Sequence, residues 1–104
     1  MNAAKIEYDP ERLVAFCRKR RIVEMSLFGS VLSDRFRPDS DVDVLVAFEP
    51  DTRYTWGEWL DMIDDLRSIF GREVDLVSRS AIERSNNPFR KRHILSHLER
   101  VYVA

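Results

Sequence analysis

The sequence predicts a small α/β domain in which a mixed β-sheet is packed by helices, in the order α-β-α-β-α-β-α. Two kinds of observation support this prediction. Short apolar segments with a two-residue period alternate with longer segments that have the period of amphipathic helices. Residues that favour helix ends and turns separate these segments. The 104 residues have room for one core, so we expect a single domain over residues 1–104.

The first helix and the first strand are marked clearly. Asp9 can cap a helix that starts with Pro10 and ends near Arg20. The apolar face of this helix carries Leu13, Phe16 and Cys17. The segment 22–28 then has the two-residue period of a strand, with one face formed by Val23, Met25 and Leu27.

The next segments are a turn, a short helix and the clearest strand of the chain. Gly29 breaks the first strand, and Ser30 is expected to cap a short helix through about Phe36. Residues 37–40 have the composition of a turn. In the strand over 42–48, one face is formed by Val42, Val44, Val46 and Phe48, and the other by Asp43, Leu45 and Ala47.

The second half of the chain contains two more helices. Residues 55–58 have the pattern of a capping box, from which a helix runs until Gly71 ends it. The apolar residues of this helix form one stripe, and their spacing favours a stripe that faces the core over one that binds a partner. The stripe consists of Trp56, Trp59, Leu60, Ile63, Leu66 and Phe70. A third strand is expected over 73–77. Asn87-Pro88 opens the last helix, and residues 101–103 can add a short edge strand.

Basic and acidic residues nearly cancel, because 17 lysines and arginines accompany 18 aspartates and glutamates. Strong nucleic-acid binding, which usually needs a positive excess, is therefore not expected. Two local basic runs stand out. Residues 18–21 fit a solvated helix end, whereas residues 90–93 are left open as a surface for an anionic substrate or partner.

Cysteine usage and hydropathy indicate the compartment. The lone cysteine, Cys17, excludes an intrachain disulfide, and its helical spacing from Leu13 predicts a buried, unreactive thiol. No apolar stretch approaches the length of about 18 residues that indicates a membrane span, and the start of the chain lacks the apolar region of a signal peptide. We therefore expect a cytoplasmic protein that does not cross a membrane.

Two phosphate-related features lie close together in the sequence. Gly29-Ser30 lets a phosphate approach the backbone and adds a hydroxyl donor, although such a turn is usually only a turn. Asp41 and Asp43 share one face of a strand, with Cα atoms roughly 6.5–7 Å apart. They can converge on a pair of magnesium ions, but an isolated Asp-x-Asp more often protects a strand edge.

Three further polar residues have positions that could contribute to a metal site. Asp75 interrupts the third strand as Asp43 interrupts the second, and it could complete a metal site or accept a proton from an attacking hydroxyl. The alternative is a surface charge. His93 and His97 have a spacing that can bind zinc, but no glutamate follows His93 as in metalloproteases. A partly exposed helix face is favoured for both histidines.

Taken together, these residues resemble a known signature. Gly29-Ser30, followed after ten residues by Asp41-x-Asp43, looks like the motif of the DNA polymerase beta-like nucleotidyltransferase superfamily. The stretch over 27–46 is especially similar to the minimal nucleotidyltransferase (MNT) branch of that superfamily. The end of the chain also resembles the end of that branch.

The resemblance implies a site and its cofactors. In that family a Gly-Ser turn holds the nucleotide phosphates, and three aspartates bind two magnesium ions. The matching residues in this chain are Gly29, Ser30, Asp41, Asp43 and Asp75. The family usually has a second glycine five residues after the first, where this chain has Asp34. A negative charge at that position could disfavour a triphosphate.

The resemblance also implies a function. Stand-alone MNT proteins are commonly antitoxins that transfer AMP from ATP onto a tyrosine of a HEPN-domain ribonuclease toxin. The near-neutral charge fits a protein acceptor, so our leading hypothesis is a protein adenylyltransferase antitoxin with a HEPN-type toxin as its partner. Two alternatives stay open. One is a nucleotidyltransferase that acts on a small molecule or an RNA end, and the other is an inactive module that neutralises a partner by binding.

Overall fold

The computed structural model describes residues 6–33, 36–37 and 39–104. Its elements, in chain order, are α1 (Pro10–Lys19), β1 (Ile22–Phe28), the 3₁₀ turn η1 (Gly29–Leu32), β2 (Val42–Phe48), α2 (Trp56–Phe70), β3 (Val74–Ser78), α3 (Arg79–Glu83), α4 (Pro88–Ser96) and β4 (Glu99–Val103). The four strands form one sheet in the order β3-β2-β1-β4. β2 is parallel to β3, whereas β1 is antiparallel to both of its neighbours, so the sheet is mixed.

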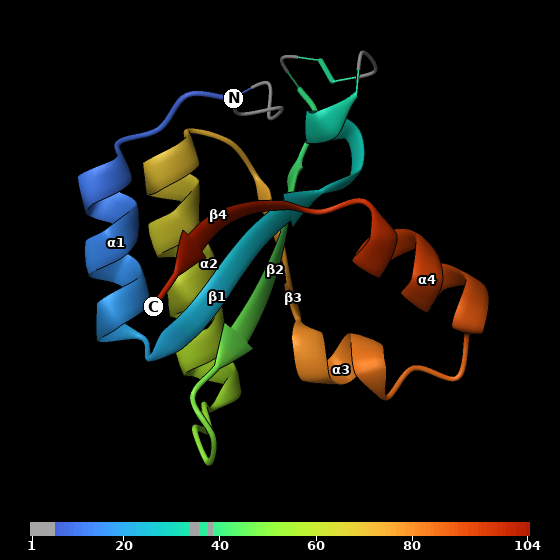
Figure 1. Ribbon diagram of the computed structural model, residues 1–104. Coiled ribbons are helices and arrows are strands. Elements are labelled where there is room, and N and C mark those ends of the chain that lie inside the picture. Colours follow the sequence, from blue (N-terminus) through green and yellow to red (C-terminus); the bar gives the residue numbers. More distant parts are fainter. Residues whose placement is uncertain (1–5, 34–35, 38) are drawn as a thin grey trace.

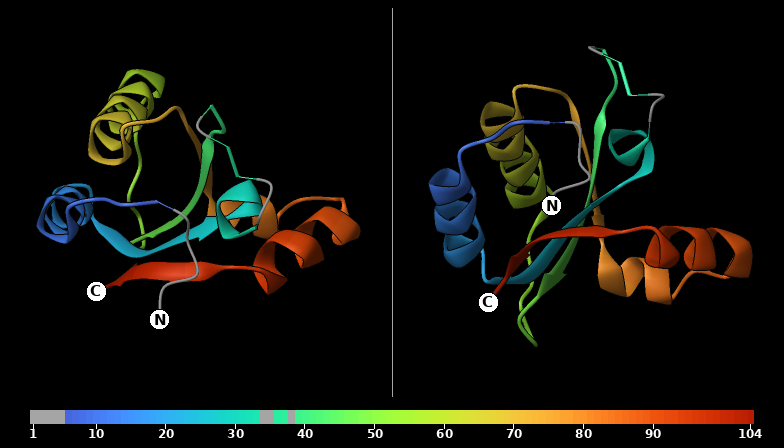
Figure 2. Two further views of the ribbon diagram at one scale, coloured as in Figure 1. Left: turned by 90° about the horizontal axis from the view of Figure 1, so that it is seen from above. Right: turned by 45° about the horizontal axis from the view of Figure 1, so that its top comes forward.

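Helices cover both faces of this sheet (Figures 1 and 2). α1 and α2 lie side by side against one face, and α3 and α4 lie on the opposite side. The main apolar core fills the α1–α2 side, where β2 contributes Val42, Val44 and Val46. A smaller cluster on the other side consists of Leu45, Ile82 and Ile94. The predicted α/β class, a mixed sheet packed by helices, is confirmed.

Local capping fixes the helix ends as the sequence predicts. The Asp9 carboxylate accepts a hydrogen bond from the Glu11 backbone amide at 2.9 Å. Thr55 and Glu58 form a reciprocal capping box at the start of α2. Gly71 ends α2 in the left-handed conformation, with φ at 68°. These interactions are local in sequence, which is why the sequence pattern was sufficient to predict them.

β1 departs from the predicted alternation because its pairing with β2 is irregular between Ile22 and Glu24. Ile22 is buried, whereas Val23, which the two-residue period placed on one face with Met25 and Leu27, is only half-buried. An extra residue in a ladder shifts the inward-facing set by one position. The prediction for the start of β1 was therefore wrong by one residue.

The buried face of α2 also differs from the predicted one. It consists of Met62, Leu66, Ile69 and Phe70, with Trp59 and Ile63 partly buried against it. Trp56 and Leu60 are 72 % and 44 % exposed, so their predicted place in the core is wrong. Apolar spacing does not say how far along a helix the covering sheet extends, and the first turn of α2 stays exposed to solvent.

Two segments have a different secondary structure from the one expected. In place of a helix capped by Ser30 and reaching Phe36, η1 is a single 3₁₀ turn that contains Ser30. After β3, Ser78 caps the additional helix α3, whose five residues are too few to show a helical period in the sequence. The expected strand over 101–103 is present as the longer β4, on the edge of the sheet.

None of the helices in the described ranges is long and apolar enough to cross a bilayer. The longest, α2, has 15 residues. A membrane-spanning helix needs about 20 predominantly apolar residues, so α2 is too short as well as charged on its exposed face.

Leu66→Ala should destabilise the protein by roughly 2–5 kcal/mol, because Leu66 is fully buried in the main core. Leu60→Ala on the same helix is the matched control and should cost less than about 1 kcal/mol, since Leu60 is largely exposed. Urea unfolding of both variants measures the difference. Equal losses would contradict the observed orientation of α2.

Candidate active site

The residues predicted from the sequence meet at one end of the sheet. Gly29 follows the last residue of β1, and Asp43 and Asp75 are each the second residue of their strands, β2 and β3. Phe28 is the partner of Asp43 across the antiparallel ladder, and Asp75 is its partner across the parallel one. Three segments that are distant in sequence therefore bring Gly29 and two carboxylates next to each other.

Both carboxylates lie on the face of the sheet that α3 and α4 cover. Val42 and Val44, which flank Asp43 along β2, are buried in the main core on the α1–α2 side. The alternation of a strand therefore turns Asp43 to the opposite face, and Asp75 is turned the same way in β3. Asp41 precedes β2 and is exposed, yet it is near enough to raise the pKa of Asp43.

Gly29 is required at its position for two reasons. Its φ of 78° lies in the left-handed region that residues with a side chain rarely adopt. In addition, a Cβ atom at Gly29 would lie 2.2 Å from Asp43 Oδ2 and 3.2 Å from Asp43 Cγ. The absence of a side chain at Gly29 therefore leaves the space that the Asp43 carboxylate occupies.

Asp43 is held in an electrostatically unfavourable place. Its pKa is raised from an ordinary value of 3.8 to about 6, mainly by burial and in addition by the negative charges of Asp75 and Asp41. Among the described residues, no lysine or arginine forms an ion pair with any of the three aspartates. The site thus concentrates negative charge that is not neutralised within the described part of the protein, which is a property of cation-binding sites.

The donor set fits magnesium that is bound together with a substrate. Within the described ranges, no three acidic, histidine or cysteine side chains are already arranged to hold a metal ion. Magnesium, however, is usually held by one or two carboxylates plus phosphate oxygens, and seldom by a complete protein cage. Asp43 and Asp75 are neighbouring oxygen donors that can supply this share, and Asp41 can add to it.

Two hollows open beside the carboxylates, and both are bounded by α4. One, of about 310 Å³, is lined by Phe28, Gly29, Asp43, Asp75, Arg90, His93, Ile94 and His97. The other, of about 390 Å³, is lined by Gly29, Ser30, Leu32, Ser33, His93 and His97. They share Gly29 and the two histidines, so a ligand on the Gly-Ser turn would have the carboxylates on one side and α4 facing it.

α4 is the part of the site that the sequence analysis did not place there, although it left residues 90–93 open as a surface for an anionic ligand. The two histidines are exposed, as predicted for a partly exposed helix face, with 5.1 Å between their ring centroids. The structure adds that this face is directed at Gly29 and the carboxylates. The sequence contains a signal for this, because Arg90, His93 and His97 lie at helical spacing around Ile94. Ile94 is the residue of α4 that is buried against the sheet.

Ser30 lines the second hollow, where a phosphate-binding turn is expected, although it does not cap a helix. Its carbonyl oxygen accepts hydrogen bonds from the amide and hydroxyl of Ser33, at 2.9 and 3.1 Å, which close the 3₁₀ turn. Because η1 is a single turn, a phosphate there would be held by backbone amides and hydroxyls, with little help from a helix dipole. Asp34, the departure from the family pattern, lies outside the described residues.

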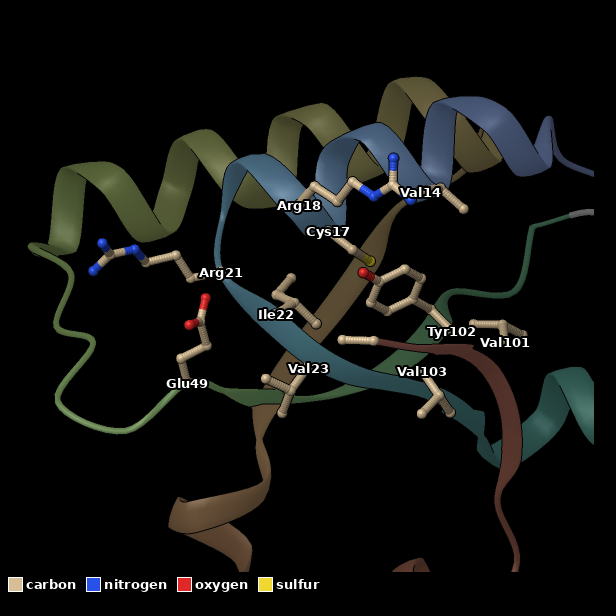
Figure 3. A pocket seen from close by; sticks show the side chains of 11 residues that line it. Val14, Cys17, Arg18, Arg21, Ile22, Val23, Glu49, Val101, Tyr102 and Val103 are labelled. Atoms are coloured by element: carbon tan, nitrogen blue, oxygen red, sulfur yellow. The ribbon is translucent and has the colours of Figure 1, made fainter.

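A larger cavity, of about 760 Å³, lies at the other end of the sheet between α1 and β4 (Figure 3). Cys17, Arg18 and Tyr102 are among the residues that line it, and Gly29 and the three aspartates are not. Burial raises the pKa of the Cys17 thiol to about 12, so the thiol stays protonated and unreactive, as predicted. Size alone therefore does not mark the chemical centre, and the acidic hollow is the better candidate.

Comparison with known proteins identifies the family to which this chain belongs. The family model described as nucleotidyltransferase domain matches residues 11–101. The chain is also 32 % identical over 85 residues to a protein of Methanocaldococcus jannaschii that is named "putative protein adenylyltransferase". That match covers 82 % of this chain and 80 % of the relative.

Two solved structures have the same fold. A toxin–antitoxin structure with AMP-PNP is similar at a TM-score of 0.68 and 20 % identity, over 92 % of this chain and 74 % of the other. A complex of the tri-AMPylated Shewanella oneidensis HEPN toxin with an MNT antitoxin is similar at a TM-score of 0.60 and 21 % identity, over 91 % of this chain and 70 % of the other. Identities of this size show a shared fold.

Gly29→Ala should destabilise the protein by about 1–2 kcal/mol through the left-handed backbone alone, and its methyl group should displace the Asp43 carboxylate. Gly57→Ala is the matched control. A Cβ at Gly57 would have only Thr55 Oγ1 near it, at 3.9 Å, so this change in α2 should stabilise by about 0.5–1 kcal/mol. Guanidinium unfolding gives both values, and an unchanged stability for Gly29→Ala would show that the turn tolerates a side chain.

Asp43→Asn should stabilise the metal-free protein at pH 7.5. The folded-state pKa of about 6 exceeds the ordinary value of 3.8, so the folded protein binds more protons than the unfolded chain between these values. Stability therefore falls as pH rises from 3.8 to 6, and above pH 6 the full penalty is present. After allowance for the partial exposure of Asp43, the expected gain at pH 7.5 is roughly 1–2 kcal/mol.

The measurement is denaturant unfolding of wild type and Asp43→Asn in EDTA at pH 7.5 and pH 4. At pH 4 the wild-type carboxyl is largely protonated in the folded protein, and most of the gain should disappear. A gain of the same size at both pH values would mean that charge at Asp43 is not its cause.

Proposed function

Because this chain belongs to the nucleotidyltransferase domain family, we propose that it is a protein adenylyltransferase that acts as an antitoxin. Its substrate is ATP, and its acceptor is a tyrosine hydroxyl of a HEPN-type toxin. The M. jannaschii relative is named for the same type of reaction, and a complex with the same fold contains an AMPylated HEPN toxin. A cytoplasmic location is part of the proposal and accords with a single, unpaired cysteine.

The observation that carries this proposal is the register of three strands. It sets Gly29, Asp43 and Asp75 side by side at a hollow, in a chain whose family transfers nucleotidyl groups. Gly29 and Ser30 would bind the phosphates, because at Gly29 no side chain would separate the backbone from a phosphate. The carboxylates then lie beside the phosphates, so cations that they hold would be close to the phosphate oxygens.

The reaction is an in-line displacement at the α-phosphorus. The tyrosine oxygen forms a bond to that phosphorus, the bond to the bridging oxygen of the β-phosphate breaks, and pyrophosphate leaves. Two magnesium ions, when bound, supply Lewis-acid stabilisation of the phosphate oxygens and activate the attacking hydroxyl. Asp41 and Asp43 would hold both ions, and Asp75 the ion beside the hydroxyl. Asp75, which is exposed, can also take up the tyrosine proton.

Transfer is tested by incubating the purified protein with the proposed HEPN-type partner toxin, magnesium and ATP. Intact-mass spectrometry should then show a mass gain on the toxin of one or more AMP groups. With Asp41→Asn and Asp43→Asn together, the rate should fall by at least about 10³-fold, because two-metal chemistry supplies several kcal/mol of the lowered barrier. EDTA should abolish the gain in the wild type.

The same experiment separates the alternatives. Labelled AMP on an RNA end or a small molecule, with none on the toxin, would replace the protein acceptor. Neutralisation of the toxin that survives the double substitution, without any mass gain in the wild type, would indicate a binding module. Asp61→Asn, an exposed change on α2 away from both hollows, controls for general effects of removing a surface charge.

A further inference from the structure

One face of α4 forms a wall opposite the Gly-Ser turn. Arg90, His93, Ile94 and His97 follow one another at helical spacing, and all four line the hollow that contains Asp43 and Asp75. The two histidines also line the hollow that contains Ser30. This face carries Arg90 and His93, two of the four residues of the basic run whose role the sequence left open.

The position of α4 is determined by contacts at several points. The Asn87 side chain caps its start by accepting hydrogen bonds from the amides of Phe89 and Arg90, both at 3.1 Å. Lys91 Nζ donates to the carbonyl oxygen of Glu83 in α3 at 3.1 Å. Ile94 is buried against the sheet in the smaller apolar cluster. Arg90 therefore faces the hollow as a consequence of how the helix is packed.

The site needs a cation that η1 does not provide. A nucleoside triphosphate is a strong anion, and it would bind beside three carboxylates. The residues of η1, together with Ser33, are all uncharged. Arg90 is the only lysine or arginine among the described residues that line either hollow. Apart from magnesium, it is thus the side chain on these walls that carries a permanent positive charge.

Two described arginines near the start of β2 are engaged elsewhere or exposed to solvent. Arg72 Nη1 donates to the carbonyl oxygen of Arg37 at 2.8 Å, and its guanidinium lies 4.2 Å from the centre of the Phe36 ring. Arg37 is exposed and lines neither hollow. Arg90, by contrast, forms no ion pair with a described residue, so its donors are available to a ligand.

His97 is less suited to hold an anion. Its Nδ1 lies 3.0 Å from the carbonyl oxygen of His93. A carbonyl oxygen can only accept, so Nδ1 must carry the hydrogen, and in a neutral ring Nε2 is then an acceptor. Such an acceptor suits a hydroxyl or amino group of a nucleoside and repels a phosphate oxygen. Arg90 is the side chain of this wall whose permanent positive charge suits a phosphate.

We propose that Arg90 of α4 binds the phosphates of the nucleotide and so makes the site selective for a triphosphate over a monophosphate. The inference rests on the proposed function in that the ligand is a nucleotide seated on Gly29-Ser30. Arg90 neither forms nor breaks a bond in the reaction. It positions the phosphates by charge-assisted hydrogen bonds from the side opposite the turn.

The test is calorimetric binding of AMP-PNP and of AMP, both with magnesium, to wild type, Arg90→Gln, Arg90→Lys and Arg92→Gln. Arg90→Gln should weaken AMP-PNP binding by roughly 10- to 100-fold, the value of one or two hydrogen bonds from a charged donor. AMP binding should change less than about 3-fold, and Arg90→Lys should recover part of the loss. Arg92→Gln is the matched control, because Arg92 is an exposed arginine of the same helix that lines neither hollow.

Three results would overturn the assignment of Arg90. These are an unchanged affinity of Arg90→Gln for AMP-PNP, an equal loss for AMP-PNP and AMP, and a loss that Arg92→Gln shares. If Arg90→Gln also unfolds at a lower temperature, the ratio of the two affinities still decides, since a structural defect weakens both ligands alike.

The assignment and the proposed function fail in different ways. If the wild-type protein binds no nucleotide, both the assignment of Arg90 and the proposed function are wrong. If the wild type transfers AMP to the toxin while Arg90→Gln binds AMP-PNP normally, only the assignment fails. If Arg90→Gln selectively loses AMP-PNP but no protein acceptor is ever modified, the assignment stands and the acceptor is wrong.

Discussion

The hydrogen-bonded ladders on the two sides of β2 determine the geometry of the site. The antiparallel ladder sets Asp43 opposite Phe28, and the parallel ladder sets it opposite Asp75. A slip of one residue in β2 would turn every side chain of the strand to the other face. Such a slip would bury Asp43 in the main core and turn the valines that alternate with it toward the α3–α4 side. The burial of these valines under α1 and α2 therefore fixes the position of the carboxylate on the opposite face.

This arrangement works against stability at the site and is supported by packing elsewhere. Asp43 is partly buried beside two like charges, and Gly29 must hold a left-handed backbone next to it. Away from the site, Glu24 of β1 pairs with both Arg79 at the start of α3 and Arg100 of β4, at 3.0 and 3.1 Å. Together with the apolar clusters on both faces, these contacts stabilise the sheet that carries the repelling charges. Functional sites commonly carry such local penalties.

Sequence predicted those parts of the structure that depend on neighbours along the chain. The caps at Asp9 and Thr55, the left-handed Gly71 and the alternation in β2 are all local, and the structure confirms them. The family resemblance rested on Gly29-Ser30 and the aspartates, and the family model confirms it. The roles of these residues in binding metal and nucleotide remain predictions.

The errors of the sequence analysis have a common physical cause. The bulge in β1, the exposure of Trp56 and the 3₁₀ turn after Gly29 depend on how the sheet meets its neighbours, which no local period records. The contribution of α4 is the clearest case. The burial of Ile94 beside Leu45, half the chain away, helps to direct Arg90 at the carboxylates.

The pairing of β4 with β1 has a consequence for the order in which the molecule assembles. In this pairing, Leu27 lies opposite Glu99 and Glu24 opposite Val103, so the pairing closes a very long loop. Contacts between residues so far apart in sequence are slow to form. β1, β2 and β3 can reach their register through shorter connections, with the aspartates already adjacent. α4 lies immediately before β4 in the chain, but its contacts with Glu83 and with Leu45 close shorter loops than the pairing of β4 with β1 does. Among the three strand pairings of the sheet, the docking of β4 therefore has the largest loop-closure cost.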